Sequence, residues 1–281
     1  MRWQRRRQSS NVEDKRGLSS KGVIGGGIGS IVIVLVVLLL GGDPTALLQN
    51  IQTSDQSTTT NYSETAEEKE QTQLVSVVLA ETEDVWHNIF SDLGESYREP
   101  KLVLFTESVQ SACGTAGAST GPFYCPGDEK LYIDLSFFND LQTRFKAPGD
   151  FAMAYVVAHE VGHHIQNLLG TMDKIQNLRS RLSEEEYNKY SVRLELQADF
   201  YAGVWAHYTD KMKGLLEEGD LDEALNAASA VGDDRIQKQA QGYIVPDSFT
   251  HGTSEQRKRW FYKGYTSGDI RRGDTFNTDN I

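Results

Sequence analysis

The chain has 281 residues and a formal net charge of −12, with 28 Lys and Arg residues against 40 Asp and Glu. This acidic balance argues against nucleic-acid binding, which needs a basic surface. The length is sufficient for one domain of roughly 210 residues with a substantial core, once an N-terminal anchor and a linker are set aside.

The basic residues are concentrated at the N-terminus, where residues 1–21 hold seven Lys or Arg against two acids. The 21 residues of 22–42 carry no charge, and Ser30 is their only ordinary polar residue. With a rise of about 1.5 Å per residue, a helix of this length spans about 31 Å, close to the hydrocarbon thickness of a bilayer. The sequence therefore predicts a transmembrane helix at 22–42, which contacts the lipid bilayer.

The distribution of charge also predicts the orientation of this helix. Because loops rich in Lys and Arg stay in the cytoplasm, we expect residues 1–21 to form a basic cytoplasmic N-terminus and the rest of the chain to lie outside. A cleaved signal peptide is the alternative, but the apolar run is long for one and residues 41–44 make a poor cleavage site. Gly25 and Gly29 form a GxxxG pattern, which favours weak self-association, although Gly-rich membrane segments often match it.

Residues 43–72 are rich in Ser, Thr, Gln and Glu, a composition that cannot bury a core. We therefore expect a flexible linker, followed by a single domain over residues 73–281. A helix is predicted from about Gln71 to Leu93 because apolar residues recur there at helical spacing. These residues are Leu74, Val78, Val85, Ile89 and Leu93.

Two strands are predicted next, at Lys101–Phe105 and Leu131–Phe137; the second has a clear alternation of apolar and polar residues. The two cysteines of the chain, Cys113 and Cys125, lie between these strands. In an extracytoplasmic domain we expect them to form a disulfide. The alternative is a pair of metal ligands, but their spacing matches no common zinc motif and no other Cys or His is close in the sequence.

A buried helix between Gly149 and Gly170 carries the pattern His-Glu-x-x-His, in which His159 and His163 are four residues apart. That spacing places both imidazoles on one face of the helix, where they can bind one metal ion. Glu160 lies beside this face, where it can accept a proton from a metal-bound water. The apolar residues that indicate the helix are Phe151, Ala154, Tyr155, Ala158, Ile165 and Leu169.

A second long helix is predicted at about Ser183–Tyr208, and Glu195 and Asp199 share one of its faces. Acids on a helix usually face water, but a catalytic zinc site takes three protein ligands, and two His plus one Glu is a known set. Glu195 is therefore the candidate third ligand. Asp199, one turn later, is the candidate acceptor for the free N–H of His159, which would fix the orientation of that ring.

The last part of the chain is predicted to be mostly helical, at Leu215–Ala230, Arg235–Gln241 and Arg257–Tyr265. His251 precedes the last helix and is flanked by small residues. A hydrolase needs a hydrogen-bond donor for the oxyanion of its tetrahedral intermediate, and His251 is a candidate for that role. The alternative is a loop histidine that only fills a turn.

The segments HEVGHH and ELQADFYAG resemble the gluzincin arrangement of zinc peptidases, and more closely the bacterial family of membrane-anchored neutral zinc metallopeptidases. The resemblance covers nearly the whole chain, including GPFYCPGDEKLYIDLSFF and FTHGTSEQRKRWFYKGY. It implies an α+β, zincin-like domain that is mainly helical with a small sheet, one edge of which binds the substrate backbone as an added strand. It also implies a bacterial inner-membrane protein whose catalytic domain is periplasmic or extracellular.

Together these features predict a zinc-dependent peptidase that acts on peptides or proteins. His159, His163 and Glu195 are the expected Zn²⁺ ligands, and Glu160 is the expected general base. His251 or an unidentified Tyr would stabilise the oxyanion. A zinc hydrolase of a non-peptide amide, such as cell-wall material, is one alternative. A non-enzymatic, membrane-tethered zinc-binding module is another, although it would have no use for Glu160.

Overall fold

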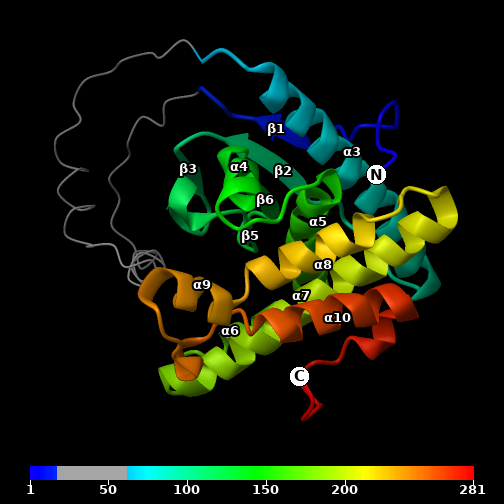
Figure 1. The fold of residues 1–281 in the computed structure, drawn as a ribbon. Coiled ribbons are helices and arrows are strands. Elements are labelled where there is room, and N and C mark those ends of the chain that lie inside the picture. The colour runs from blue at the N-terminus through cyan, green and yellow to red at the C-terminus, as the bar shows by residue number, and fades with distance from the viewer. Residues whose placement is uncertain (18–61) are drawn as a thin grey trace.

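The structure is a computed structural model that describes residues 1–17 and 62–281. The described part of the chain is mainly helical with a small sheet, as expected for an α+β, zincin-like domain (Figure 1). Its main sheet has four strands in the order β1-β2-β6-β5, of which β1, β2 and β6 are parallel and β5 is antiparallel to β6. The strands are β1 (Val12–Asp14), β2 (Lys101–Phe105), β5 (Phe123–Cys125) and β6 (Lys130–Asp134).

Both faces of this sheet are covered, because alternate side chains of β2 and β6 enter two different apolar clusters. Leu102 and Leu131 belong to the large core that also contains the main helices. Val103 and Tyr132 point to the opposite side, into a smaller cluster that includes Cys125. The second side is covered by a two-stranded hairpin, formed by β3 (Ser108–Ser111) and β4 (Gly114–Gly117).

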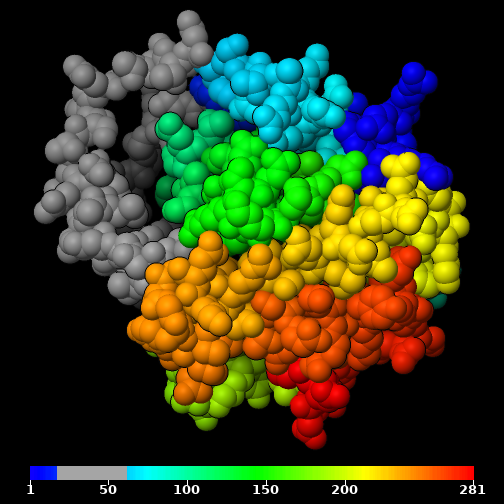
Figure 2. All heavy atoms as spheres, viewed as in Figure 1, coloured from blue at the N-terminus to red at the C-terminus, as the bar shows by residue number. Residues whose placement is uncertain are grey.

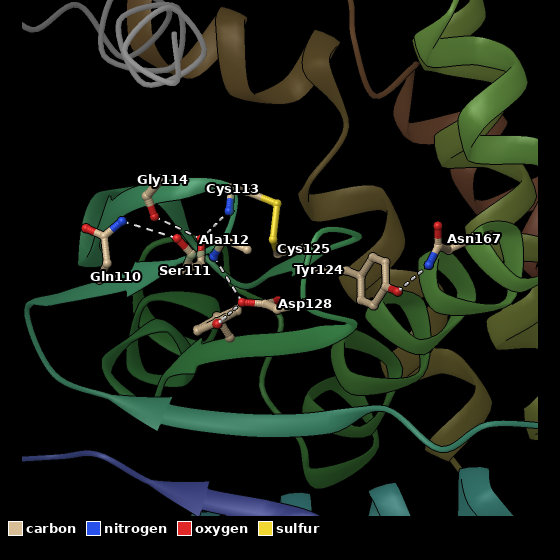
Figure 3. The surroundings of a disulfide bond; sticks show 10 residues. Gln110, Ser111, Ala112, Cys113, Gly114, Tyr124, Cys125, Asp128 and Asn167 are labelled. Carbon is tan, nitrogen blue, oxygen red and sulfur yellow. Dashed lines mark hydrogen bonds between the residues drawn. A yellow bond between two sulfur atoms is a disulfide. The ribbon is translucent and has the colours of Figure 1, made fainter. Parts of the chain in front are cut away.

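A disulfide between Cys113 and Cys125 joins that hairpin to strand β5, which confirms the predicted pairing (Figure 3). Asp128 strengthens the same junction, since it accepts hydrogen bonds from the Ala112 amide at 3.0 Å and from the Tyr132 hydroxyl at 2.6 Å. Closing a loop of this size with a disulfide stabilises a fold by about 3 kcal/mol. The junction therefore holds edge strand β5 in a defined position.

Five long helices make up the rest of the core, and α7 contacts both α5 and α10 along its length (Figure 1). They are α3 (Ala66–Asp92), α5 (Asp150–Leu168), α7 (Glu184–Lys213), α8 (Asp220–Ala230) and α10 (Ser254–Ser267). Shorter helices connect them: α4 (Ser136–Thr143), α6 (Thr171–Gln176) and α9 (Asp233–Gln241). The metal-binding motif predicted from the sequence lies on α5, with α7 and α8 against it.

Three of the long helices begin with a capping box, in which two backbone N–H groups at the helix start are satisfied by side chains. The pairs are Thr65 with Glu68 in α3, Ser183 with Glu186 in α7, and Thr253 with Gln256 in α10. The first lies inside the segment predicted as a linker, so residues 66–72 are helical and the linker ends earlier than residue 72.

Three other element boundaries differ from those predicted. The strand expected at Leu131–Phe137 ends at Asp134, whose carboxylate accepts the Ser136 N–H at 2.9 Å and turns the chain into α4. Helix α7 ends at Lys213, five residues beyond the predicted end at Tyr208. Helix α8 starts at Asp220, because Gly219 before it has a left-handed backbone conformation.

The predicted transmembrane helix at 22–42, with Gly25 and Gly29, lies outside the described residues. No helix in residues 1–17 and 62–281 is both long enough and apolar enough to cross a bilayer. Residues 1–17 pack on the domain, with β1 in the main sheet and Trp3 buried in the core. In Figure 2 these blue residues lie against the start of α3 in cyan and residues near α8 in yellow. Residues 1–21 were predicted to form a separate cytoplasmic segment, so this packing was not expected.

The crossing of α7 and α10 depends on two glycines that face each other's helix. A Cβ added to Gly203 would overlap the Phe261 carbonyl oxygen, and one added to Gly264 would overlap the Phe200 carbonyl oxygen. We expect Gly203→Ala and Gly264→Ala each to lower the free energy of unfolding by about 3 kcal/mol or more. The steric clash makes the change destabilising, although the higher helix propensity of Ala would by itself raise the free energy of unfolding by about 1 kcal/mol.

Urea denaturation followed by circular dichroism measures this change. Gly117→Ala is the matched control, because Gly117 has an extended backbone and its added Cβ would have no neighbour closer than 3.5 Å. Wild-type stability in both helix variants would contradict the packing described here.

Candidate metal centre

Helices α5 and α7 bring three ligand side chains together at their point of contact. His159 Nε2 lies 3.2 Å from one carboxylate oxygen of Glu195, and His163 Nε2 lies 3.4 Å from the other. These are the three residues predicted as ligands, and suitable donor atoms of all three lie within 4.8 Å of one another. The two histidines are buried, whereas the Glu195 side chain is 18% exposed. Of the three ligands, Glu195 therefore has the most contact with solvent.

The spacing of these atoms fits a tetrahedral zinc ion. Bonds of about 2.0–2.1 Å in a tetrahedron separate neighbouring ligand atoms by about 3.3–3.4 Å. Each histidine nitrogen lies about this far from one of the two Glu195 oxygens, at 3.2 and 3.4 Å, and one donor atom of each residue lies within 4.8 Å of the other two. Two imidazoles and one carboxylate are also a donor set that zinc accepts in catalytic sites, where a fourth position stays open.

Each ligand histidine is oriented through its other ring nitrogen. Nδ1 of His159 is 2.9 Å from an oxygen of Asp199, as predicted, and Nδ1 of His163 is 2.9 Å from the side-chain oxygen of Gln166. In the neutral ring Nδ1–H donates to these acceptors, so that Nε2 is the nitrogen left to bind a metal once the ring has lost its second proton.

Gln166 is a positioning residue that the sequence analysis missed. Its amide nitrogen donates to the Leu194 carbonyl at 2.6 Å and to the Gln197 side chain at 3.2 Å, which fixes the amide group so that its oxygen faces His163. The signal was present, since Gln166 follows His163 by three residues on the same helix face. It was not recognised because a Gln near a motif has many ordinary roles on a helix.

Asp199 is held in turn by Arg257 from helix α10. Arg257 donates to both carboxylate oxygens of Asp199, at 2.8 and 3.0 Å, and Tyr155 donates to the same carboxylate at 2.5 Å. Burial alone would raise the pKa of Asp199, but the charges of Arg257 and His159 lower it by more than burial raises it. The net pKa therefore lies below its ordinary value, and the carboxylate stays charged. Burial lowers the pKa of His159, but Asp199 and Glu195 raise it more, to about 9. Arg257 and Tyr155 were not predicted as part of the site.

The close approach of α5 and α7 requires the glycine of the motif. Gly162 faces Ala198 of α7, and an added Cβ would lie 2.8 Å from the Ala198 carbonyl oxygen. Gly162 precedes His163 directly, and Ala198 precedes Asp199 directly. The absence of a side chain at Gly162 therefore sets the distance between the two helices at the level of the metal ligands.

Glu160 lies beside the three ligands, as predicted, with only 7% of its surface exposed. In the described part of the chain no group donates a hydrogen bond to its carboxylate, and its oxygens are not among the fully enclosed atoms that lack a partner, so they keep contact with solvent. Burial raises its pKa, and the nearby His163 and His159 partly oppose that rise. A buried carboxylate with a raised pKa and no structural partner is suited to proton transfer.

His251 lies in the loop before α10, and this loop packs against α7 next to Glu195. A Cβ added to Gly252 would lie 3.1 Å from Val192 and 3.5 Å from Leu196, and His251 and Glu195 are near enough for their charges to change each other's pKa. The His251 side chain is 46% exposed, so one side of the ring is open to solvent. The structure thus brings His251 toward the metal ligands without placing it among them.

Asp233 orients His251 and was not predicted as part of the site. One of its oxygens accepts three backbone N–H groups of the loop, from Thr250, His251 and Gly252, at 2.6–3.0 Å. The other oxygen is 3.2 Å from His251 Nδ1. Partial burial lowers the pKa of His251, but Asp233 raises it more, so the net pKa lies above its ordinary value.

Because Gln166 fixes the ring of His163, we expect Gln166→Leu to weaken zinc binding by about 10–100-fold. Competition with a fluorescent zinc chelator measures the dissociation constant. Gln176→Leu, at the exposed end of α6, is the matched control and should bind zinc like the wild type. Equal affinities for the Gln166→Leu variant and the wild type would remove Gln166 from the site.

Comparisons with known proteins identify the family to which the chain belongs. The chain is 48% identical over 286 residues to the uncharacterized protein YpfJ of Escherichia coli K12, an alignment that covers 98% of this chain and 99% of that protein. It is 43% identical over 203 residues to the uncharacterized protein Rv2575 of Mycobacterium tuberculosis H37Rv, covering 69% and 68% of the two chains. No solved structure matches it. A family model described as "Putative neutral zinc metallopeptidase" matches residues 1–276, and the chain belongs to that family.

Proposed function

We propose that this chain is a zinc-dependent peptidase that hydrolyses peptide bonds in peptides or proteins. The observation that carries the proposal is the buried, unpartnered carboxylate of Glu160 beside three side chains arranged for one metal ion. A purely structural zinc site is closed by four protein ligands and has no need of a base. Here three ligands leave one position for water or substrate.

The chemistry divides among the residues of the site. His159, His163 and Glu195 would hold zinc, which when bound acts as a Lewis acid and lowers the pKa of water. Glu160 accepts a proton from the attacking water and delivers it to the leaving amine. Its raised pKa suits both transfers, because a group that must accept and then release a proton works best with a pKa near the working pH.

His251 is the proposed donor to the oxyanion that forms when the carbonyl is attacked. Its pairing with Asp233 supports this role, since the carboxylate favours the protonated ring and fixes its orientation. Tyr155, the tyrosine nearest to the ligands by its hydrogen bonds, is fully engaged with Asp199 and Arg257. His251 is therefore the better candidate of the two.

Strand β5 is the proposed docking edge for the substrate backbone. It is one of the two edges of the main sheet, and it lies against α5. The Tyr124 hydroxyl of β5 is 3.0 Å from His164 Nδ1 and accepts a hydrogen bond from Asn167, also at 3.0 Å (Figure 3). A peptide that pairs with this edge as an added strand would run beside the helix that carries the motif.

The location that we propose is the outer side of a bacterial inner membrane, with residues 22–42 as the contact to the bilayer. Two observations support this location. The Cys113–Cys125 disulfide is typical of proteins outside the cytoplasm, and the apolar run is long enough to enter a bilayer. Substrates close to the membrane would then be the accessible ones.

Replacing Glu160 with Gln tests the proposed function. The variant should retain one zinc per chain but lose at least about 10²-fold in turnover, because only the proton acceptor is removed. Cleavage of a diverse peptide library, followed by mass spectrometry, measures the activity of both proteins. Absence of cleavage by the zinc-loaded wild type would contradict the proposal and favour a non-peptide amide substrate or a binding role.

The pairing of His251 with Asp233 predicts a pH effect. Activity should require protonated His251, so it falls as the pH rises through the raised pKa of this group. Asp233→Asn removes the charge that raises the pKa, so activity should fall at a lower pH than in the wild type, nearer to the ordinary histidine value of 6.5. The pH dependence of kcat/KM measures this shift.

Asp234→Asn is the matched control, because Asp234 binds Ser254 at 2.8 Å and has no contact with His251. An unchanged alkaline limb in the Asp233→Asn variant would exclude His251 as the titrating donor.

A further inference from the structure

We propose that residues 1–17 dock on the acidic face of the chain's own domain, and that both therefore lie on the same side of the membrane. The N-terminal segment, as residues 1–17 are called from here on, precedes the apolar run in the sequence, and the domain follows it. This inference concerns the topology of the chain and does not depend on its being a peptidase.

The first observation is main-chain pairing. Strand β1 of the N-terminal segment is parallel to β2, with Val12 opposite Leu102 and Asp14 opposite Leu104. Asn11 accepts a hydrogen bond from the Leu102 N–H at 2.8 Å, and the Lys15 N–H donates to Leu104 at 2.8 Å. The N-terminal segment thus completes the sheet at the edge opposite to β5.

The second observation is the environment of Glu83 in helix α3. This residue is only 2% exposed, so its carboxylate needs partners that replace water. In the described part of the chain, all of its hydrogen-bond partners belong to the N-terminal segment. Arg7 donates to it at 2.8 Å and Asn11 at 3.0 Å, and Ser9 donates as well. The N-terminal segment thus supplies the charge and the hydrogen bonds that replace water at this buried carboxylate.

The remaining contacts are also complementary in charge and shape. Arg6 pairs with the buried Glu81 at 3.2 Å, and Glu13 pairs with Lys130 at 2.9 Å. Trp3, at 6% exposure, is part of the main core. The α-ammonium group of Met1 also lies 2.9 Å from Asp150, the first residue of helix α5. The segment is therefore built into the domain through backbone, charge and apolar contacts together.

These contacts conflict with a single crossing of the bilayer between the two parts. Paired strands are about 4.8 Å apart, whereas the two sides of the hydrocarbon core are separated by about 30 Å. The cytoplasmic location of residues 1–21 was predicted from their positive charge. In the structure, arginines of the N-terminal segment form ion pairs with acids of α3, which accounts for part of that positive charge without a cytoplasmic location.

Cysteine labelling tests the proposal in the full-length chain. Ser10→Cys in the N-terminal segment and Ser96→Cys in the domain both place the new thiol at an exposed position. The two native cysteines are bonded to each other and do not react. Spheroplasts expressing each variant are treated with a membrane-impermeant maleimide, before and after detergent permeabilisation. We expect the two positions to behave alike, either both labelled or both protected; labelling of only one before permeabilisation would overturn the proposal.

A second measurement tests the docking itself in native membranes. A carbodiimide should join the Glu13 carboxylate to the amine of Lys130 or Lys101, which lie at 2.9 and 3.1 Å, and mass spectrometry detects the linked peptides. Glu13→Gln is the control and should abolish this cross-link. Absence of the cross-link in the wild-type chain would show that the N-terminal segment is not docked.

Discussion

The contact between α5 and α7 at Gly162 and Ala198 is the constraint on which the rest of the site depends. His159 and His163 are on one helix and Glu195 is on the other, so the three can meet only if the helix axes come close. A Cβ at Gly162 would separate the helices at that level. Small residues at helix crossings recur in this protein, and Gly203 and Gly264 serve the same purpose between α7 and α10.

Close packing of these helices buries charged side chains, and each of them is stabilised by hydrogen bonds or ion pairs to a neighbouring side chain. Asp199 orients His159, and Arg257 and Tyr155 in turn hold Asp199. The network joins α5, α7 and α10, so the same contacts that align the ligands also hold three helices together. Glu160 is the exception, because it is buried beside the network without joining it. That contrast between satisfied acids and one free acid is the strongest physical indication of catalysis.

The site residues that lie four apart on one helix could be predicted from the sequence, because that spacing alone places both side chains on the same face of the helix. His159, His163 and Asp199 lie where that spacing predicted. Gln166 has the same kind of local spacing to His163 but was missed, whereas the role of Arg257 depends on which helices meet in space. The docking of the N-terminal segment was missed for a similar reason, because β1 and β2 are far apart in sequence and their pairing leaves no local pattern.

X-ray absorption spectroscopy of the zinc-loaded protein tests the central claim most directly, because it reports the atoms around the metal. The account predicts one zinc per chain with two histidine nitrogens, carboxylate oxygen and a solvent oxygen, at about 2.0–2.2 Å, and no sulfur. The Glu195→Ala variant should lose the carboxylate contribution and bind zinc more weakly. A spectrum that requires four protein ligands, or one that Glu195→Ala leaves unchanged, would contradict the open three-ligand site.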